Sequence, residues 1–341
     1  KWGIFPAASA AWRISDESFM EWSKDWLSTL KMRASYGKSG NARVGSYWRQ
    51  TYSPVTSTKN LYYQNEIGQS SLQPAKRLRN ENLTWESKFS TNVGFDLGFF
   101  SNRINLTFDY YNDVTKDLIM EVQLPSNAGY SSQYQNLGQT TNRGVELSLN
   151  ANLVQTKDFY LDFNFNIAFN KNKVDALYGA NGDEMILSGG GTETGSDNYR
   201  VFVGQEVGLM YGYVSDGMYS FDDFTFNPTT KKWDIVTTKD ENGVPIVTDC
   251  SGVLSRAGGY FGPGHMKLKD LNGDGVIDAD NDRKVIGHAL PKHTGGFSFN
   301  AGWKGFDVTA MFNWSYGNDI LNINKVDYTS YTGRSEEHTS E

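Results

Sequence analysis

The residues best suited to chemistry in this sequence lie in one acidic loop near residue 275. Oxygen-bearing groups alternate there with other residues, and the candidate ligands are Asp270, Asn272, Asp274, the Val276 carbonyl and Asp278. This pattern matches the first half of an EF-hand loop, in which hard oxygen ligands surround Ca²⁺ and a glycine allows a sharp turn. The twelfth position is Asn281 rather than Glu, so we expect weak, structural Ca²⁺ binding. A metal-free loop closed by Asx-turns is the alternative.

No other group of residues has the spacing of a catalytic or cofactor site. The histidines fit no zinc-ligand pattern; they are His265, His288, His293 and His338. Cys250 has no nucleophile context, and the glycine run at 189–191 lacks the Gly-Lys-Ser/Thr that follows in a phosphate-binding loop. We therefore predict that the protein is not an enzyme and that it needs no cofactor besides the possible Ca²⁺.

Aromatic residues in the long connections are better candidates for binding. They are Trp48, Tyr52, Tyr62, Tyr63, Tyr130 and Tyr134. Aromatic rings provide large apolar contact surfaces that anchor ligands and protein partners. For each of them, packing inside its own loop is the alternative.

Size and composition limit the class of protein. A chain of 341 residues can bury a sizeable core, and its single cysteine rules out an internal disulfide framework. The net charge of −7 argues against nucleic acid as the main partner. Aromatic residues make up 14% of the chain beside 35 glycines, a composition that favours strands and turns. We expect an all-β protein.

Paired stretches of alternating residues give the strongest structural signal. Apolar side chains recur at every second position in 89–99 and again in 103–110, and a tight turn joins the two stretches. A period of two indicates strands, and a length of roughly ten residues suits a strand that crosses a bilayer at a tilt. The predicted strands cover 2–12, 29–36, 89–99, 103–110, 145–153, 159–169, 297–303 and 306–314, and a brief helix is expected in 15–26.

Short and long connections alternate between these strands. The long ones are 37–84, 112–142 and 173–292, and all of them fall at one end of an antiparallel arrangement. Outer-membrane barrels have this asymmetry, with short periplasmic turns and long extracellular loops. We predict part of an antiparallel transmembrane β-barrel with about eight membrane strands. A soluble β-sandwich also alternates, but the polar face here is mostly Asn, Ser, Thr, Gly and Asp, which suits a polar lumen.

Several segments, taken in order, resemble the SusC/RagA family of TonB-linked outer-membrane proteins. They are 5–15, 30–41, 82–96, 142–147, 203–213, 270–275 and 295–319. The resemblance as a whole covers nearly all of the chain, up to about Tyr331. It implies a barrel of about 22 strands that is closed by an N-terminal plug. It also implies import of oligosaccharides or peptides across the outer membrane of a Gram-negative bacterium. The implied partners are a SusD-like surface lipoprotein, TonB and membrane lipid.

The resemblance also sets the expected domain organisation. We expect residues 1–331 to be part of the barrel, with the plug, the TonB box, the early strands and the last strands outside this chain. Residues 333–341 are charged and non-periodic, and we expect a non-native tail, with a native polar loop as the alternative. A passive porin or adhesin barrel and a soluble carbohydrate-binding β-sandwich are the alternative functions.

Overall fold

The computed structural model describes residues 2–41, 52–54, 72–74, 77–177, 184–187, 198–239, 241, 243, 245–254 and 261–322. The chain divides into two compact units. The first comprises Lys1–Met185, Val201–Val207 and Leu290–Asn318, and the second comprises Ile186–Arg200, Gly208–Ala289 and Asp319–Glu341.

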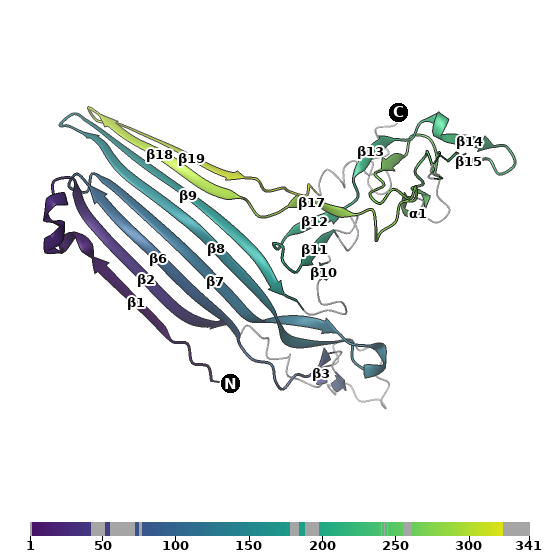
Figure 1. Ribbon diagram of the computed structural model, residues 1–341, viewed down its shortest axis with the longest axis horizontal. Helices are drawn as coiled ribbons and strands as arrows, with labels where there is room; N and C mark the ends of the chain where they lie inside the picture. The colour runs from purple at the N-terminus through teal and green to yellow at the C-terminus, as the bar shows by residue number, and fades with distance from the viewer. Residues whose placement is uncertain are drawn as a thin grey trace, which may run out of the picture. The chain divides into compact units, whose positions relative to one another are not determined.

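The first unit is built on one sheet of long antiparallel strands (Figure 1), which confirms the predicted fold class. In sheet order the strands are β1 (Ala7–Arg13), β2 (Leu27–Asn41), β6 (Glu86–Phe99), β7 (Ile104–Gln123), β8 (Ser132–Gln155), β9 (Phe159–Ala176), β18 (His293–Trp303) and β19 (Phe306–Tyr316). The two-residue strand β5 (Arg77–Leu78) pairs in parallel with the start of β8. A separate pair consists of β3 (Tyr52–Pro54) and β4 (Leu72–Pro74).

The short connections all lie at one end of this sheet, as predicted. They span 100–103, 156–158 and 304–305, and the first contains three successive residues with positive φ, Phe100, Ser101 and Asn102. Between β1 and β2 the chain forms two 3₁₀ segments, Ile14–Asp16 and Ser18–Ser23, where one helix was expected. The strand ends that lead into the long connections lie at the opposite end of the sheet.

Strands β7 and β8 extend well beyond the range that alternation predicts. The interval 112–142 was expected to be a long loop, but only 124–131, with a 3₁₀ turn at Ser126–Ala128, connects the two strands. The extension contains register shifts between Thr115 and Ile119, and Asp117 has a φ of 58°. Its sequence lacks a continuous apolar face, so the period-two signal disappears although the strands continue.

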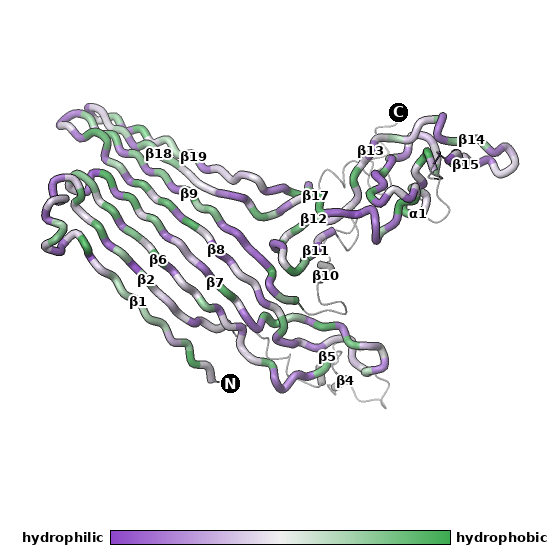
Figure 2. The backbone as a smooth tube through the Cα atoms, viewed as in Figure 1, coloured by the Kyte–Doolittle hydropathy of each residue, from purple (hydrophilic) through white to green (hydrophobic). Residues whose placement is uncertain are grey.

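One face of the long sheet is lined with apolar side chains. A single row crosses seven strands with directly opposed residues, namely Leu30, Leu97, Leu106, Leu149, Phe165, Phe297 and Phe312. Figure 2 shows how hydrophobic and hydrophilic positions alternate along these strands. Val93, Phe95, Phe163 and Phe165 are partly exposed rather than buried, so no second sheet of the described unit covers this face. That observation excludes the β-sandwich for the first unit.

The second unit has a small core of its own, which the sequence analysis missed. It contains two pairs of short strands, β13 (Ser215–Met218) with β16 (Met266–Leu268) and β14 (Phe224–Asn227) with β15 (Lys232–Ile235). The other short strands, β10 (Glu184–Leu187), β11 (Tyr199–Phe202), β12 (Leu209–Gly212) and β17 (Lys284–His288), form one sheet. The helical segments are 3₁₀ Phe221–Asp223 and α1 (Ser251–Leu254). The core consists of Tyr219, Phe224, Val247, Cys250, Leu268 and Ile277.

Strands of three to five residues are too short to reveal a period, so the sequence predicts only a long connection here. In the described segments, no helix has the length and hydrophobicity of a membrane-spanning helix.

Candidate functional site: the polar face of the sheet

The face opposite the apolar rows carries the candidate functional residues. Strict alternation places Arg33 of β2, Asp109 of β7 and Glu146 of β8 on this face, and register aligns them across the sheet. The next row toward the long connections contains Asn92, Tyr111, Gly144 and Asn170. Because neighbouring residues of a strand point to opposite faces, this polar surface and the apolar rows lie on the two sides of a single layer.

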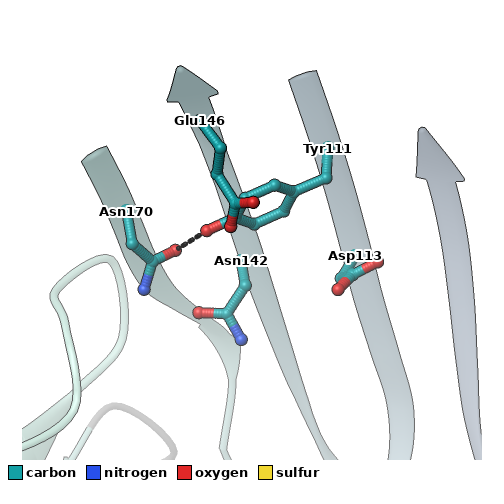
Figure 3. Close-up of a pocket in the computed structure, with 5 residues that line it drawn as sticks. All are labelled: Tyr111, Asp113, Asn142, Glu146 and Asn170. Carbon is teal, nitrogen blue, oxygen red and sulfur yellow. Dashed lines mark hydrogen bonds between the residues drawn. The ribbon is translucent and has the colours of Figure 1, made fainter. Parts of the chain in front are cut away.

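A recess of about 390 Å³ opens on this polar face. Its lining residues come from three adjacent strands: Tyr111 and Asp113 from β7, Asn142 and Glu146 from β8, and Asn170 from β9. Figure 3 shows the Tyr111 ring extending from β7 across β8 toward Asn170, with the Glu146 carboxylate beside it. The recess therefore depends on strand register, since its residues lie up to 59 positions apart in the chain.

A glycine makes the position of the Tyr111 ring possible. The hydroxyl of Tyr111 donates to Asn170 Oδ1 at 3.0 Å, and Gly144 lies between these two residues in the register. A Cβ atom on Gly144 would approach the Tyr111 oxygen to 2.5 Å and the Phe169 carbonyl oxygen to 2.3 Å. Both approaches are far inside van der Waals contact, so the ring can cross β8 only above a glycine.

The polar groups of the recess differ in whether they already have a hydrogen-bond or ion-pair partner. Lys88 Nζ lies 2.7 Å from Asp113 Oδ2 and neutralises that carboxylate. Asn172 donates to Asn142 Oδ1 at 2.7 Å, and the Asn142 amide nitrogen donates to no other residue in the described part of the chain, so it can donate into the recess. Among the described residues, the exposed carboxylate of Glu146 has neither an ion pair nor a hydrogen bond. The recess thus offers an acceptor carboxylate, amide donors and an aromatic ring to a ligand.

An ion-pair cluster stabilises the same face on β2, β6 and β7. The Arg33 guanidinium donates from Nε to Asp96 Oδ2 at 2.9 Å, and its Nη2 lies 3.1 Å from Asp109. A Cβ on Gly94 would lie 2.3 Å from Asp109 Oδ1 and 2.8 Å from Arg33 Nη2, so glycine leaves the space that the cluster fills. Charge-assisted pairs of this geometry are stronger than neutral hydrogen bonds. The cluster joins β2, β6 and β7 on the polar side.

The predicted metal-binding loop is closed by its own hydrogen bonds. The carboxylate of Asp270 accepts from the N–H groups of Gly273 and Gly275 at 2.6 and 2.7 Å, and Asp274 accepts from Val276 at 2.8 Å. Asp278 accepts from the Asn281 side-chain amide and from the backbone N–H groups of Asn281 and Asp280, and these bonds lower the pKa of its carboxyl group. Asn272 donates to Asp274.

This is the Asx-turn arrangement that the sequence analysis gave as the alternative. Within the described segments, no three His, Cys, Asp or Glu side chains are grouped as metal ligands are. Calcium binding stays a prediction.

The predicted loop aromatics have different outcomes. Trp48, Tyr62 and Tyr63 lie outside the described residues, and of Tyr52 the structure describes the backbone alone, in β3. Tyr130 lies in the connection between β7 and β8 and is half-buried. Tyr134 belongs to β8 rather than to a loop; its hydroxyl donates to Glu121 at 3.0 Å and Arg77 stacks over its ring. Tyr134 thus contacts Arg77 and Glu121, and its binding role stays a prediction.

No pattern in the sequence predicts the recess. Asp113 and Asn142 fall in the interval that was expected to be a long loop, and Asn170 falls on the polar side of a predicted strand. No sequence motif links these residues. A register assignment between β7, β8 and β9 would have placed them together, but alternation by itself fixes the face of a residue and not its partner on the next strand.

Comparisons with known proteins agree on one family. The sequence model described as "TonB dependent receptor-like, beta-barrel" matches residues 1–337. TonB-dependent receptor P39 of Formosa agariphila is 34% identical over 327 residues, which cover 94% of this chain and 30% of that protein. TonB-dependent receptor SusC of Bacteroides thetaiotaomicron is 28% identical, with coverage of 94% and 28%. The chain thus spans about 30% of the length of these curated relatives.

The fold is also similar to that of solved structures. The RagAB peptide importer in its "closed-closed" state superposes with a TM-score of 0.65 at 23% identity, covering 92% of this chain and 29% of that chain. The structure of the RagAB peptide transporter gives a TM-score of 0.63 at 24% identity.

Proposed function

Because the chain belongs to the TonB dependent receptor-like, beta-barrel family, we propose that it forms part of the wall of an outer-membrane importer energised through TonB. One observation carries the proposal: a single-layer sheet has apolar rows on one face and a polar, recessed surface on the other. This division suits a wall between lipid and a polar lumen. Members of this family are receptors and transporters, so we propose transport rather than catalysis.

We propose that the cargo is an oligosaccharide or another polar nutrient, received together with a SusD-like surface lipoprotein. The resemblance to the SusC/RagA family supports the lipoprotein, and the chemistry of the polar face supports the cargo. Hydroxyl groups both donate and accept hydrogen bonds, and the recess offers the Glu146 carboxylate as acceptor beside the Asn142 amide as donor. Weak contacts of this kind let a polar solute pass along the wall without being trapped.

The test is uptake by a strain that lacks the native receptor and carries the intact receptor with single substitutions. Glu146→Gln and Asn142→Ala should each slow uptake of the cognate nutrient while the receptor remains folded in the outer membrane. Asn166→Ala is the matched control, because Asn166 lies on the same face of β9 but outside the recess. Equal uptake by all three variants would remove the recess from the transport path.

TonB dependence separates an importer from the passive porin. Uptake through the intact receptor should stop when TonB is deleted, because an energised importer requires it and a passive pore does not. Uptake that continues without TonB would refute the proposal.

We also propose that aromatic residues of the long connections contact cargo or lipoprotein. Trp48→Ala should weaken both uptake and co-purification of the lipoprotein, with the receptor still assembled. If neither quantity changes, Trp48 only packs inside its loop.

A further inference from the structure

A cluster of cations lies on the outward face of the sheet, immediately beyond its apolar rows. We name it the outer basic belt and define it as Lys38, Lys116, Arg143, Lys171 and Lys173. Alternation places each of these residues on the same face as Val93, Val145 and Phe169. At the centre of the belt, Arg143 of β8 and Lys171 of β9 are directly opposed in the register.

The level of the belt follows from strand geometry. On β9 the outward side chains from Phe159 to Phe169 are all apolar, and they span ten residue steps. At ~3.4 Å per step this is roughly 34 Å along the strand, and a tilt of about 40° reduces it to about 26 Å across the membrane. That thickness matches the apolar band of ~25 Å expected for outer-membrane barrels. Lys171, the next outward residue, therefore lies about 5 Å beyond the hydrocarbon, at headgroup level.

The belt lies at the end of the sheet from which the long connections leave, which is the extracellular side. The lipid that reaches it belongs to the outer leaflet. Aromatic side chains mark the same boundary: Tyr36, Tyr110 and Phe169 are 55%, 40% and 46% exposed on the outward face. Aromatic residues at this position are typical of the membrane–water interface.

The two central charges of the belt lack partners within the described chain, whereas the three outer ones have neighbours. Lys173 lies 3.6 Å from Asp175, and Lys38 and Lys116 flank the ring of Phe89 at 5.4 and 5.6 Å. Arg143 and Lys171 are both exposed, and neither makes an ion pair or a side-chain hydrogen bond with another described residue. Like charges that are directly opposed on neighbouring strands destabilise a sheet. An anion between them converts that repulsion into attraction.

We propose that the outer basic belt binds the phosphate groups of a phosphorylated outer-leaflet lipid, with Arg143 and Lys171 as its centre. The site combines cations at headgroup level with a continuous apolar surface directly below, so it fits a molecule with phosphate at one end and acyl chains at the other. Arg143 can meet two phosphate oxygens with its planar fork, and Lys171 adds a point charge.

The test uses the intact receptor in nanodiscs of phosphatidylcholine, supplemented with bis-phosphorylated lipid A or with its dephosphorylated form. Lipid retained by the receptor is counted by native mass spectrometry. We expect the wild type to retain phosphorylated lipid A in preference to the dephosphorylated form. The double variant Arg143→Gln/Lys171→Gln should bind phosphorylated lipid A about 30-fold more weakly. Lys31→Gln, on the polar face of β2, is the matched control and should change nothing.

The melting temperature of the receptor gives a second test. It distinguishes lipid binding by Arg143 and Lys171 from a purely structural role of these two residues. With phosphorylated lipid A, the double variant should melt below the wild type because the lipid contact is lost. In phosphatidylcholine alone it should melt at or above the wild type, because the repulsion between the two cations is removed. Equal retention of both lipid A forms, equal binding by variant and wild type, or the same stabilisation by inorganic phosphate alone would each overturn the proposal.

Discussion

Placing arginine in the middle of the apolar face is the most direct test of which side of the sheet meets lipid. Leu149 lies at the centre of the outward band, directly opposed by Leu106 and Phe165. Its neighbour Ser148 points to the other face, between Thr107 and Asn166. Leu149→Arg and Ser148→Arg therefore place the same side chain at adjacent positions. The first arginine would face lipid and the second would face the polar lumen.

The expected difference between the two variants is large. An arginine on the lipid face near the bilayer midplane costs about 2–4 kcal/mol, whereas a lumen-facing arginine remains hydrated. We expect Leu149→Arg to lose ~3 kcal/mol, which is roughly a 150-fold shift in the folding equilibrium. Ser148→Arg should stay within about 1 kcal/mol of the wild type. Phe95→Arg, on the same face of β6, should resemble Leu149→Arg.

The measurement is denaturant-induced unfolding of the intact receptor in lipid vesicles, followed by tryptophan fluorescence, with the folded fraction checked by gel mobility. If Ser148→Arg is as damaging as Leu149→Arg, or more so, the assignment of the two faces is wrong. Equal and small effects for both variants would place this part of the sheet in water.

Four further predictions concern the glycine, the ion cluster, the acidic loop and the second core. Gly144→Ala should destabilise the barrel by about 1–3 kcal/mol, because the new Cβ meets the Phe169 carbonyl oxygen. Adding Tyr111→Ala should not relieve that clash. Unfolding in lipid vesicles measures the stability of both variants. Arg33→Gln should lower the free energy of unfolding by ~1–3 kcal/mol, because it leaves Asp96 and Asp109 without their cation. Adding Asp109→Asn to this variant should restore part of that free energy. No recovery would mean that the cluster is not held together by charge. Titrated Ca²⁺ should protect 270–282 from proteolysis in the wild type and not in Asp274→Ala; no protection, or equal protection of both, would end the calcium prediction. Burial, followed by the contact with the Cys250 side chain, raises the pKa of Tyr219 above its usual value, so the folded second unit favours the neutral phenol. This unit should therefore lose stability as pH rises above about 10, where the unfolded chain gives up the proton; Tyr219→Phe should remove that alkaline loss in hydrogen exchange, and an unchanged profile would refute it.

The acidic loop shows how far a motif can be interpreted. The sequence correctly predicts a tight turn, since Asp270 closes it by accepting from Gly273 and Gly275. The sequence does not reveal what the loop is attached to. Ile277 is 2% exposed in the core of the second unit, and its N–H donates to the Asp249 carbonyl at 2.9 Å. The loop is thereby anchored to residues that precede it by nearly thirty positions, a contact that no local pattern encodes.

The sequence alone determined the family, the strands of the membrane band and the face of each residue on them. Alternation is a local property, because successive side chains of a strand must point to opposite sides. It failed where both faces become polar, as in the outer parts of β7 and β8. It also failed where strands are too short to show a period, as in the second unit.

Only the tertiary structure decided which residues of different strands meet. The recess around Tyr111 and the opposed cations Arg143 and Lys171 both arise from register. A shift of one residue between β8 and β9 would separate each pair, and register is set by turns, bulges and the packing of many side chains at once.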